Sequence, residues 1–155
     1  MRKEFCIVVL AGRSNKIYES IVQSNKFDLI VVDSHKDFDC NKFLEQIKEY
    51  SKIIFVFALG SRSSMIILSY ILKNIDKQYL VIANEPFKFE GKRKNANAQE
   101  ALEYLESEKI NKIIIASKYI LKKYYGLNCK DTLLNVMQNI NLEILKNIEK
   151  IVLNS

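Results

Sequence analysis

The chain has 155 residues, of which 48% are hydrophobic, so it fits one domain with an ordinary apolar core. Its formal charge is +6, but 18 acidic residues are interspersed with 24 basic ones, which indicates a mixed lysine-rich surface and argues against nucleic-acid binding. Three separated cysteines and one histidine argue against a disulfide framework and against a zinc site.

The apolar runs are all short. The N-terminal run, Phe5–Leu10, is too short for the core of a signal sequence, and no other run approaches the length of a membrane span. We therefore expect a cytoplasmic protein without a membrane span.

Five segments are typical of strands, and the first of them, Phe5–Ala11, is a continuous apolar run of the kind that is buried on both faces. They cover Phe5–Ala11, Leu29–Val32, Ile53–Leu59, Gln78–Ala83 and Ile110–Ala116.

Apolar residues at three- and four-residue spacing follow each run and predict helices. These are a helix capped by Ser14, helices over Phe38–Tyr50, Met65 to about Asn74 and Lys118–Tyr125, one that buries Ala98, Ala101, Leu102 and Leu105, and a long one from Asp131 to about Leu153. The alternation predicts an α/β fold, a three-layer Rossmann-like parallel sheet with helices on both faces that ends in a long helix.

In such a fold the loops that follow the strands gather at one edge, where ligands bind. They are Gly12–Asn15, Asp33–His35, Gly60–Ser64 and Glu85–Lys94. The first and third carry glycine and small polar residues ahead of a helix, which suits phosphate. Neither GxGxxG nor GxxxxGK[ST] occurs, so a dinucleotide fingerprint and a P-loop are absent.

Other reactive residues favour structural roles. His35 would need a partner to act as a general base, and Asp33 is near it only in sequence, so a solvated loop histidine is the simpler interpretation. Cys6 lies in a predicted strand, and neither Cys40 nor Cys129 has an evident activating base. The run 92–94 has two open interpretations, a solvated start of a helix or charge that neutralises an anionic ligand.

The segment Pro86–Lys94, followed by Ala98, Ala101, Leu102 and Leu105, resembles the PFxFEGxxR…A…GL…L signature of FtsZ, the bacterial tubulin-like GTPase. Ile110–Ile115 looks like the VDTLIVI strand of that family, and Thr132–Met137 is similar to its SLLDAF helix. Val8–Asn15 stands where the family has its glycine-rich first loop. The resemblance implies one FtsZ-like N-terminal domain of the GTPase type over 1–155, without the family's C-terminal domain.

The resemblance also implies a nucleotide site with GTP or GDP as its ligand and no metal-binding residue of the protein. Its residues would be Gly12 and Asn15 in the first loop, Gly60 and Ser61 in the phosphate turn, Glu90 and Lys94 at the ribose, Met137 against the base, and Asn141 reading guanine.

Departures from the family pattern concern the chemistry. The phosphate-cradling GGGTGTG is replaced by Ala58–Ser64 with one glycine, and Ala116–Lys118 stands in place of the guanine-reading PND. Lys94 lacks the planar fork of the family's Arg. The sequence ends at Ser155, where the long helix would finish and before the family's catalytic loop, so the resemblance implies no catalytic residue and no family-type GTP hydrolysis.

Two functions follow from the resemblance. The first is a degenerate FtsZ-like protein that regulates cell division or cytoskeletal assembly by contacts with full-length FtsZ, another division protein or itself. The second is a switch that binds GTP, GDP or another mononucleotide without hydrolysing it. An unrelated α/β enzyme that uses His35 with Asp33, and a piece of a longer GTPase, are the remaining alternatives.

Overall fold

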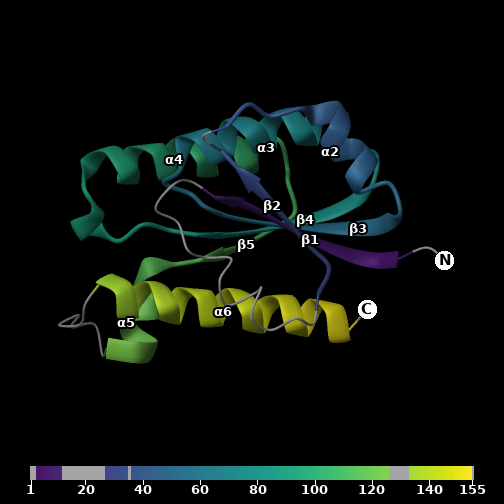
Figure 1. The fold of residues 1–155 in the computed structure, drawn as a ribbon. Helices are drawn as coiled ribbons and strands as arrows, with labels where there is room; N and C mark the ends of the chain where they lie inside the picture. Colours follow the sequence, from purple (N-terminus) through teal and green to yellow (C-terminus); the bar gives the residue numbers. More distant parts are fainter. Residues whose placement is uncertain (1–2, 12–26, 35, 126–132, 155) are drawn as a thin grey trace.

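The computed structural model describes residues 3–11, 27–34, 36–125 and 133–154. Five parallel strands form one sheet in the order β2-β1-β3-β4-β5 (Figure 1). The strands are β1 Lys3–Ala11, β2 Leu29–Asp33, β3 Tyr50–Ala58, β4 Gln78–Asn84 and β5 Lys112–Ile115.

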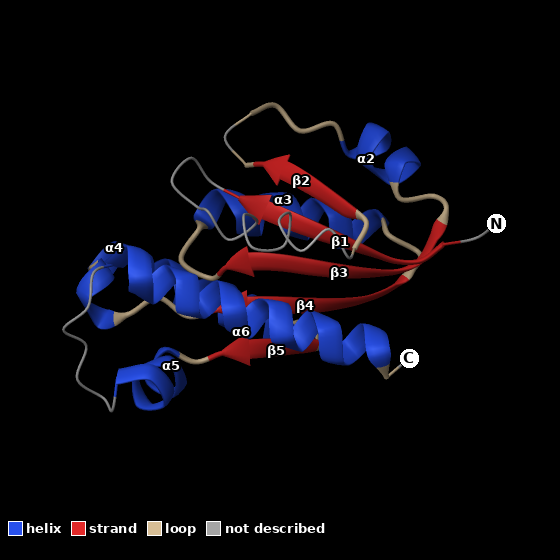
Figure 2. Cartoon of the chain, turned by 60° about the horizontal axis from the view of Figure 1, so that its bottom comes forward, coloured by secondary structure: helices blue, strands red, loops and turns tan. Residues whose placement is uncertain are grey.

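Helices cover both faces of this sheet, as Figure 1 and Figure 2 show. The upper layer of Figure 1 holds α2 Cys40–Gln46, α3 Arg62–Asn74 and α4 Lys92–Ser107, and the lower layer holds α5 Ser117–Tyr125 and α6 Leu133–Leu153. A short 3-10 helix, η1 Lys88–Glu90, precedes α4. The predicted three-layer α/β fold with a long last helix is confirmed.

The sheet separates two apolar cores because successive strand residues point to opposite faces. Val8 and Phe55 pack with α3 residues such as Leu68 on the upper side. Ile7 and Ile54 pack on the lower side with residues of α6, namely Val136, Ile140, Ile144 and Ile148. Burial on both faces accounts for the continuous apolar runs.

Tyr50 corrects the prediction of a helix over Phe38–Tyr50. The helix α2 ends at Gln46, and Tyr50 begins β3, where it pairs with Lys3 of β1. Its hydroxyl donates a hydrogen bond of 3.0 Å to Asp28 Oδ2. The backbone hydrogen bonds of the sheet and this side-chain bond replace the further helical turn that the apolar spacing predicted.

The fifth strand is also shorter than predicted. Ile110 lies in the turn after α4, where its N–H donates to Leu105 O over 3.0 Å, and the strand begins at Lys112. The predicted helix after Ser14 and the residues Gly12, Asn15, His35 and Cys129 lie outside the described residues. Within the described part of the chain, no helix is both long and apolar enough to cross a membrane.

Candidate functional site at the carboxyl edge of the sheet

The strand register brings the carboxyl ends of the strands to one edge. Ala11 pairs with Asp33, and Asn84 pairs with both Ala58 and Ile115. The turns that begin at Gly60 and at Glu85 therefore start side by side, where the alternation predicted a ligand site.

Ser61 forms the N-cap of α3. Its hydroxyl accepts a hydrogen bond of 3.4 Å from the Ser64 N–H and donates one of 2.8 Å to Ser64 Oγ. The fully buried Ser64 hydroxyl in turn donates to Leu10 O of β1 over 3.4 Å. The first turn of α3 is thus capped by the Ser61 side chain and attached to β1.

A second pair of hydroxyls connects this turn to the end of β2. Ser63 Oγ donates to Ser34 Oγ over 2.9 Å, and Ser34 Oγ donates to Ala11 O over 3.0 Å. The hydroxyl groups at this edge therefore hydrogen-bond to one another and to the carbonyl oxygens of Leu10 and Ala11 at the end of β1.

Gly60 lies against the first turns of α4. A methyl group built on Gly60 would approach Lys94 Cβ and Lys94 O to 3.3 Å each. The Asn97 side chain also donates to Gly60 O over 3.4 Å. Close packing by α4 therefore accounts for the one glycine that this turn retains.

Glu90 and Lys94 lie together, with 3.6 Å between Glu90 Oε1 and Lys94 Nζ. The other carboxylate oxygen, Glu90 Oε2, accepts a bond of 2.7 Å from the Phe87 N–H and so closes the turn of η1. Both oxygens of this carboxylate, a predicted ribose contact, have partners within its own segment.

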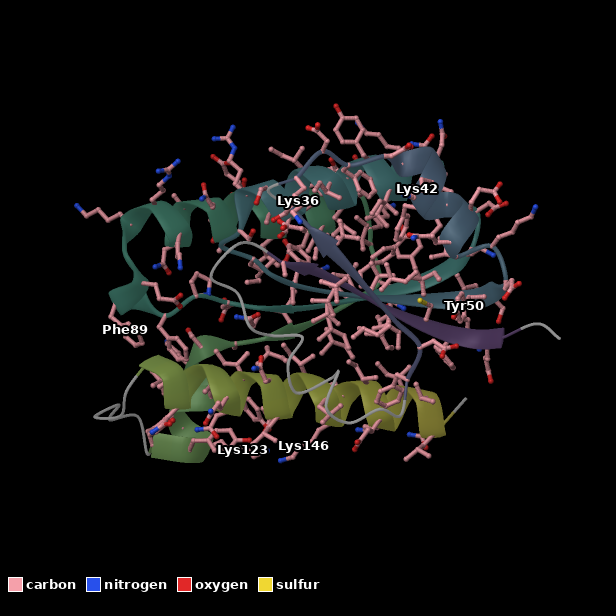
Figure 3. All side chains as sticks on the ribbon, viewed as in Figure 1. Lys36, Lys42, Tyr50, Phe89, Lys123 and Lys146 are labelled. Atoms are coloured by element: carbon pink, nitrogen blue, oxygen red, sulfur yellow. The ribbon has the colours of Figure 1, made fainter. Side chains whose placement is uncertain are left out.

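The two aromatic residues of the PFxFEG segment have different environments. Phe87 is 1% exposed and belongs to the lower core, whereas Phe89 is 59% exposed (Figure 3). Their rings stack with 5.1 Å between centroids and 5° between planes. Phe87 anchors the segment, and Phe89 covers it from the solvent side.

Two further contacts hold this segment in place. Gly91 has a φ of 105°, a conformation that side chains disfavour, and it is the N-cap residue of α4. Glu85 Oε1 accepts a bond of 2.9 Å from the Ser117 N–H, which attaches the turn after β4 to the start of α5. The resemblance is strongest where the chain has these backbone requirements.

Asn84 is a candidate that sequence reasoning missed. It is 5% exposed at the end of β4, and its Oδ1 is buried without a hydrogen-bond partner in the described structure. Because Asn84 follows Ile82 by two residues, it faces the lower layer. The sequence signal that could have identified it is the position of a polar residue directly after the apolar run that ends at Ala83.

Asn141 is also buried, at 4% exposure, among the core residues of α6. The Met137 side chain lies outside the described residues. The predicted base-binding roles of both residues remain predictions.

A polar cluster between α5 and α6 lies apart from the loops that the sequence singled out. Glu143, 5% exposed, accepts bonds from Lys123 Nζ and, over 2.7 Å, from the Tyr124 hydroxyl, and Lys146 Nζ is 3.8 Å away (Figure 3 labels Lys123 and Lys146). Burial favours a higher pKa for Glu143, but the bonds from Lys123 and Tyr124 and the nearby ammonium charges lower its pKa overall. Burial and the bond to Glu143 raise the pKa of Tyr124 to about 12.

The sequence matches no family model and no curated protein. The solved structures to which the chain is similar include two whose fold it shares over about half of their length. The empty FtsZ dimer from M. jannaschii has a TM-score of 0.67 at 16% identity, over 95% of this chain and 53% of that chain. The GDP-bound CetZ1 monomer from Haloferax volcanii has a TM-score of 0.63 at 11% identity, over 94% of this chain and 58% of that chain. The chain thus spans a little over half the length of these proteins, and its fold is FtsZ/tubulin-like.

Proposed function

We propose that this chain is a degenerate FtsZ-like protein that acts through protein contacts in cell division or cytoskeletal assembly and does not hydrolyse GTP as the family does. The FtsZ/tubulin-like fold supports the assignment to FtsZ-like proteins. The turn between β3 and α3 supports the loss of GTP hydrolysis.

A phosphate-binding turn offers backbone N–H groups at a helix start and leaves room for the backbone to approach the ligand. Here the Ser61 hydroxyl accepts a hydrogen bond from the Ser64 N–H, and the Ser63 hydroxyl donates one to Ser34 Oγ. Behind the turn, Lys94 fills the space next to Gly60. A triphosphate would have to displace these contacts, which disfavours the family mode of binding.

The ribose side supports the same proposal. Glu90 closes η1 through the Phe87 N–H and pairs with Lys94, so a ribose hydroxyl would compete with contacts that hold the turn. On this proposal, the segment Pro86–Lys94 is needed for the fold, because it fixes how the chain passes from β4 into α4.

Phosphate release from GTP, measured with the purified chain alone and with full-length FtsZ from the same cell, tests this proposal. We expect no release above background from the chain alone and a change in FtsZ assembly in a sedimentation assay. Sustained GTP turnover by the chain alone, or FtsZ assembly that is unchanged at equimolar chain, would contradict it.

A nucleotide switch without hydrolysis is the second candidate, and Asn84 favours it. Its buried Oδ1 has no donor among the residues that the structure describes, and a ligand hydroxyl or amino group would supply one. One of the proteins with this fold is described as GDP-bound.

Thermal unfolding in the presence of GDP, GTP and other mononucleotides tests this candidate. A ligand at a hundredfold its Kd stabilises a protein by about 2.7 kcal/mol, which raises Tm by several degrees. We expect the nucleotide-dependent shift to be lost in Asn84→Ala and kept in Lys88→Ala, an exposed control outside the strand end. The absence of a shift at millimolar nucleotide would remove this candidate.

A further inference from the structure

The charges of α4 oppose the dipole of the helix. Lys92, Arg93 and Lys94 occupy its first turn, which contains no acidic residue, whereas Glu103 and Glu106 lie near an end whose last turn contains no basic residue. The backbone dipole favours anions at the start of a helix and cations at its end. These charges therefore do not stabilise α4 itself, and another role is needed to explain them.

Five exposed residues of α4, three of them charged, form a regular outer stripe. Lys92, Ala96, Gln99, Glu103 and Glu106 are all exposed and follow one another at alternating four- and three-residue spacing, the spacing of a helix seam that faces another helix. The opposite face of α4 is buried against the sheet through Ala98, Ala101 and Leu105. None of Lys92, Arg93, Glu103 and Glu106 is in an ion pair within the described part of the chain.

This stripe is complementary to itself when two copies run antiparallel. With a two-fold axis between Ala96 and Gln99, Lys92 of one copy lies opposite Glu103 of the other, and Ala96 lies opposite Gln99. The small Ala96 and the uncharged Gln99 lie near the axis, where identical charges would otherwise meet. An antiparallel arrangement also opposes the two helix dipoles. We infer that α4 is the contact of an antiparallel homodimer of this chain, with two-fold symmetry.

A groove next to this helix, lined by none of the five stripe residues, adds partly apolar surface to the contact. It lies between α3 and α4, encloses about 250 Å³, and is lined in part by Met65, Ile66 and Tyr104. Ile66 is 48% exposed. Figure 1 shows α3 and α4 together in the upper layer. The α4 helix of a second copy would cover Ile66 at the edge of this groove.

Glu100 does not oppose this arrangement, because Arg62 and Lys73 line the same groove and offset its charge. The helix is about 24 Å long at 16 residues, which makes the contact small. The dimer is therefore weak and sensitive to salt. It does not depend on the proposed loss of GTP hydrolysis, so its failure would leave that proposal unaffected.

Sedimentation velocity of the purified chain at low ionic strength and at about 0.5 M salt, where the Debye length is only several ångström, tests the inference. Three variants accompany it. Lys92→Glu, with the neighbouring Arg93→Glu, makes the stripe acidic. Glu103→Lys with Glu106→Lys makes it basic, and all four changes together reverse the charges at both ends of the helix. Circular dichroism and Tm confirm that each variant is folded.

We expect the wild type to form dimers at low salt and to dissociate at high salt. Each two-residue variant alone is expected to be monomeric, an equimolar mixture of the two to form heterodimers, and the four-residue variant to dimerise like the wild type. A wild type that is monomeric at high protein concentration and low salt overturns the inference. So do dimers that persist in both two-residue variants, or a mixture of these variants that stays monomeric.

Discussion

Gly91 shows how one backbone angle fixes the passage from η1 into α4. A methyl group built at this position meets no atom within 4 Å, so the φ of 105° is the reason that favours glycine here. We expect Gly91→Ala to lower the free energy of unfolding by about 1–3 kcal/mol through backbone strain alone.

Urea denaturation of Gly91→Ala and of Lys88→Ala, an exposed neighbour, measures this effect. The control should change the free energy of unfolding by less than about 0.5 kcal/mol. Equal stability of Gly91→Ala and the wild type would show that the angle is not needed in solution.

Glu143 joins α5 to α6, because its Oε1 accepts bonds from the Lys123 ammonium and the Tyr124 hydroxyl. Glu143→Gln keeps an amide oxygen at this place but removes the negative charge that both bonds depend on. We expect Glu143→Gln to cost about 1–3 kcal/mol at pH 7. Lys146→Met removes only the outer partner, which is 3.8 Å away and whose side chain is 57% exposed, and should cost less than about 1 kcal/mol.

The cost of Glu143→Gln should depend on pH with a definite sign. Because the pKa of Glu143 is lowered on folding from its ordinary value of 4.5, its carboxylate stabilises the fold above that pH. The stability is lost as pH falls through the lower pKa of the folded state. Urea unfolding of both proteins at several pH values should therefore show curves that converge under acidic conditions, and a constant difference down to pH 3 would contradict this assignment.

Two variants of the segment between β4 and α4 test whether its PFxFEG motif has a structural role. Phe87→Ala should cost about 3–5 kcal/mol, since Phe87 is 1% exposed and fills the lower core. Phe89→Ala, which loses the ring stacking but little burial, should cost about 1 kcal/mol. Thermal unfolding of both variants distinguishes them, and similar losses would show that Phe89 also anchors the segment.

The strands were the most predictable elements, because burial on both faces produces continuous apolar runs such as that of β1. The end of α2 was not predictable from spacing alone. Tyr50 continued the helical pattern, but its backbone pairs with Lys3, a residue distant in sequence. Long-range hydrogen bonds of this kind decide boundaries that local patterns leave open.

The candidate site was predictable in position and less so in detail. The sequence placed Gly60, Glu90 and Lys94 at the carboxyl edge, because parallel strands end together. It could not show that Lys94 packs on Gly60 or that Glu90 bonds to the Phe87 N–H, since both contacts depend on how α4 docks. The buried Oδ1 of Asn84 likewise depends on its neighbours in three dimensions.

For the molecule as a whole, the alkylation rate of the Cys6 thiol measures how often the sheet opens. Cys6 is 0% exposed in β1, which lies between β2 and β3, whereas Cys40 is half-buried at the start of α2. Burial and then the charge of Asp39 raise the pKa of the Cys40 thiol, which slows its alkylation at neutral pH. We expect Cys40 to react slowly under native conditions and Cys6 only when the molecule unfolds.

Alkylation followed by peptide mass spectrometry separates the two sites. The rate at Cys6 should rise with urea in parallel with global unfolding, while the rate at Cys40 changes less. Equal rates at the two sites without urea would show that β1 opens locally.

The strand order β2-β1-β3-β4-β5 also has a consequence during synthesis of the chain. The first two strands can pair as soon as both have left the ribosome, and each later strand then adds to an outer edge of a sheet that already exists. The upper helices appear between the strands and can cover their face as the sheet grows. The contribution of α6 to the lower face, from Val136 to Ile148, comes last. A nascent chain that pauses before α6 therefore presents to chaperones the part of the lower apolar face that α6 covers.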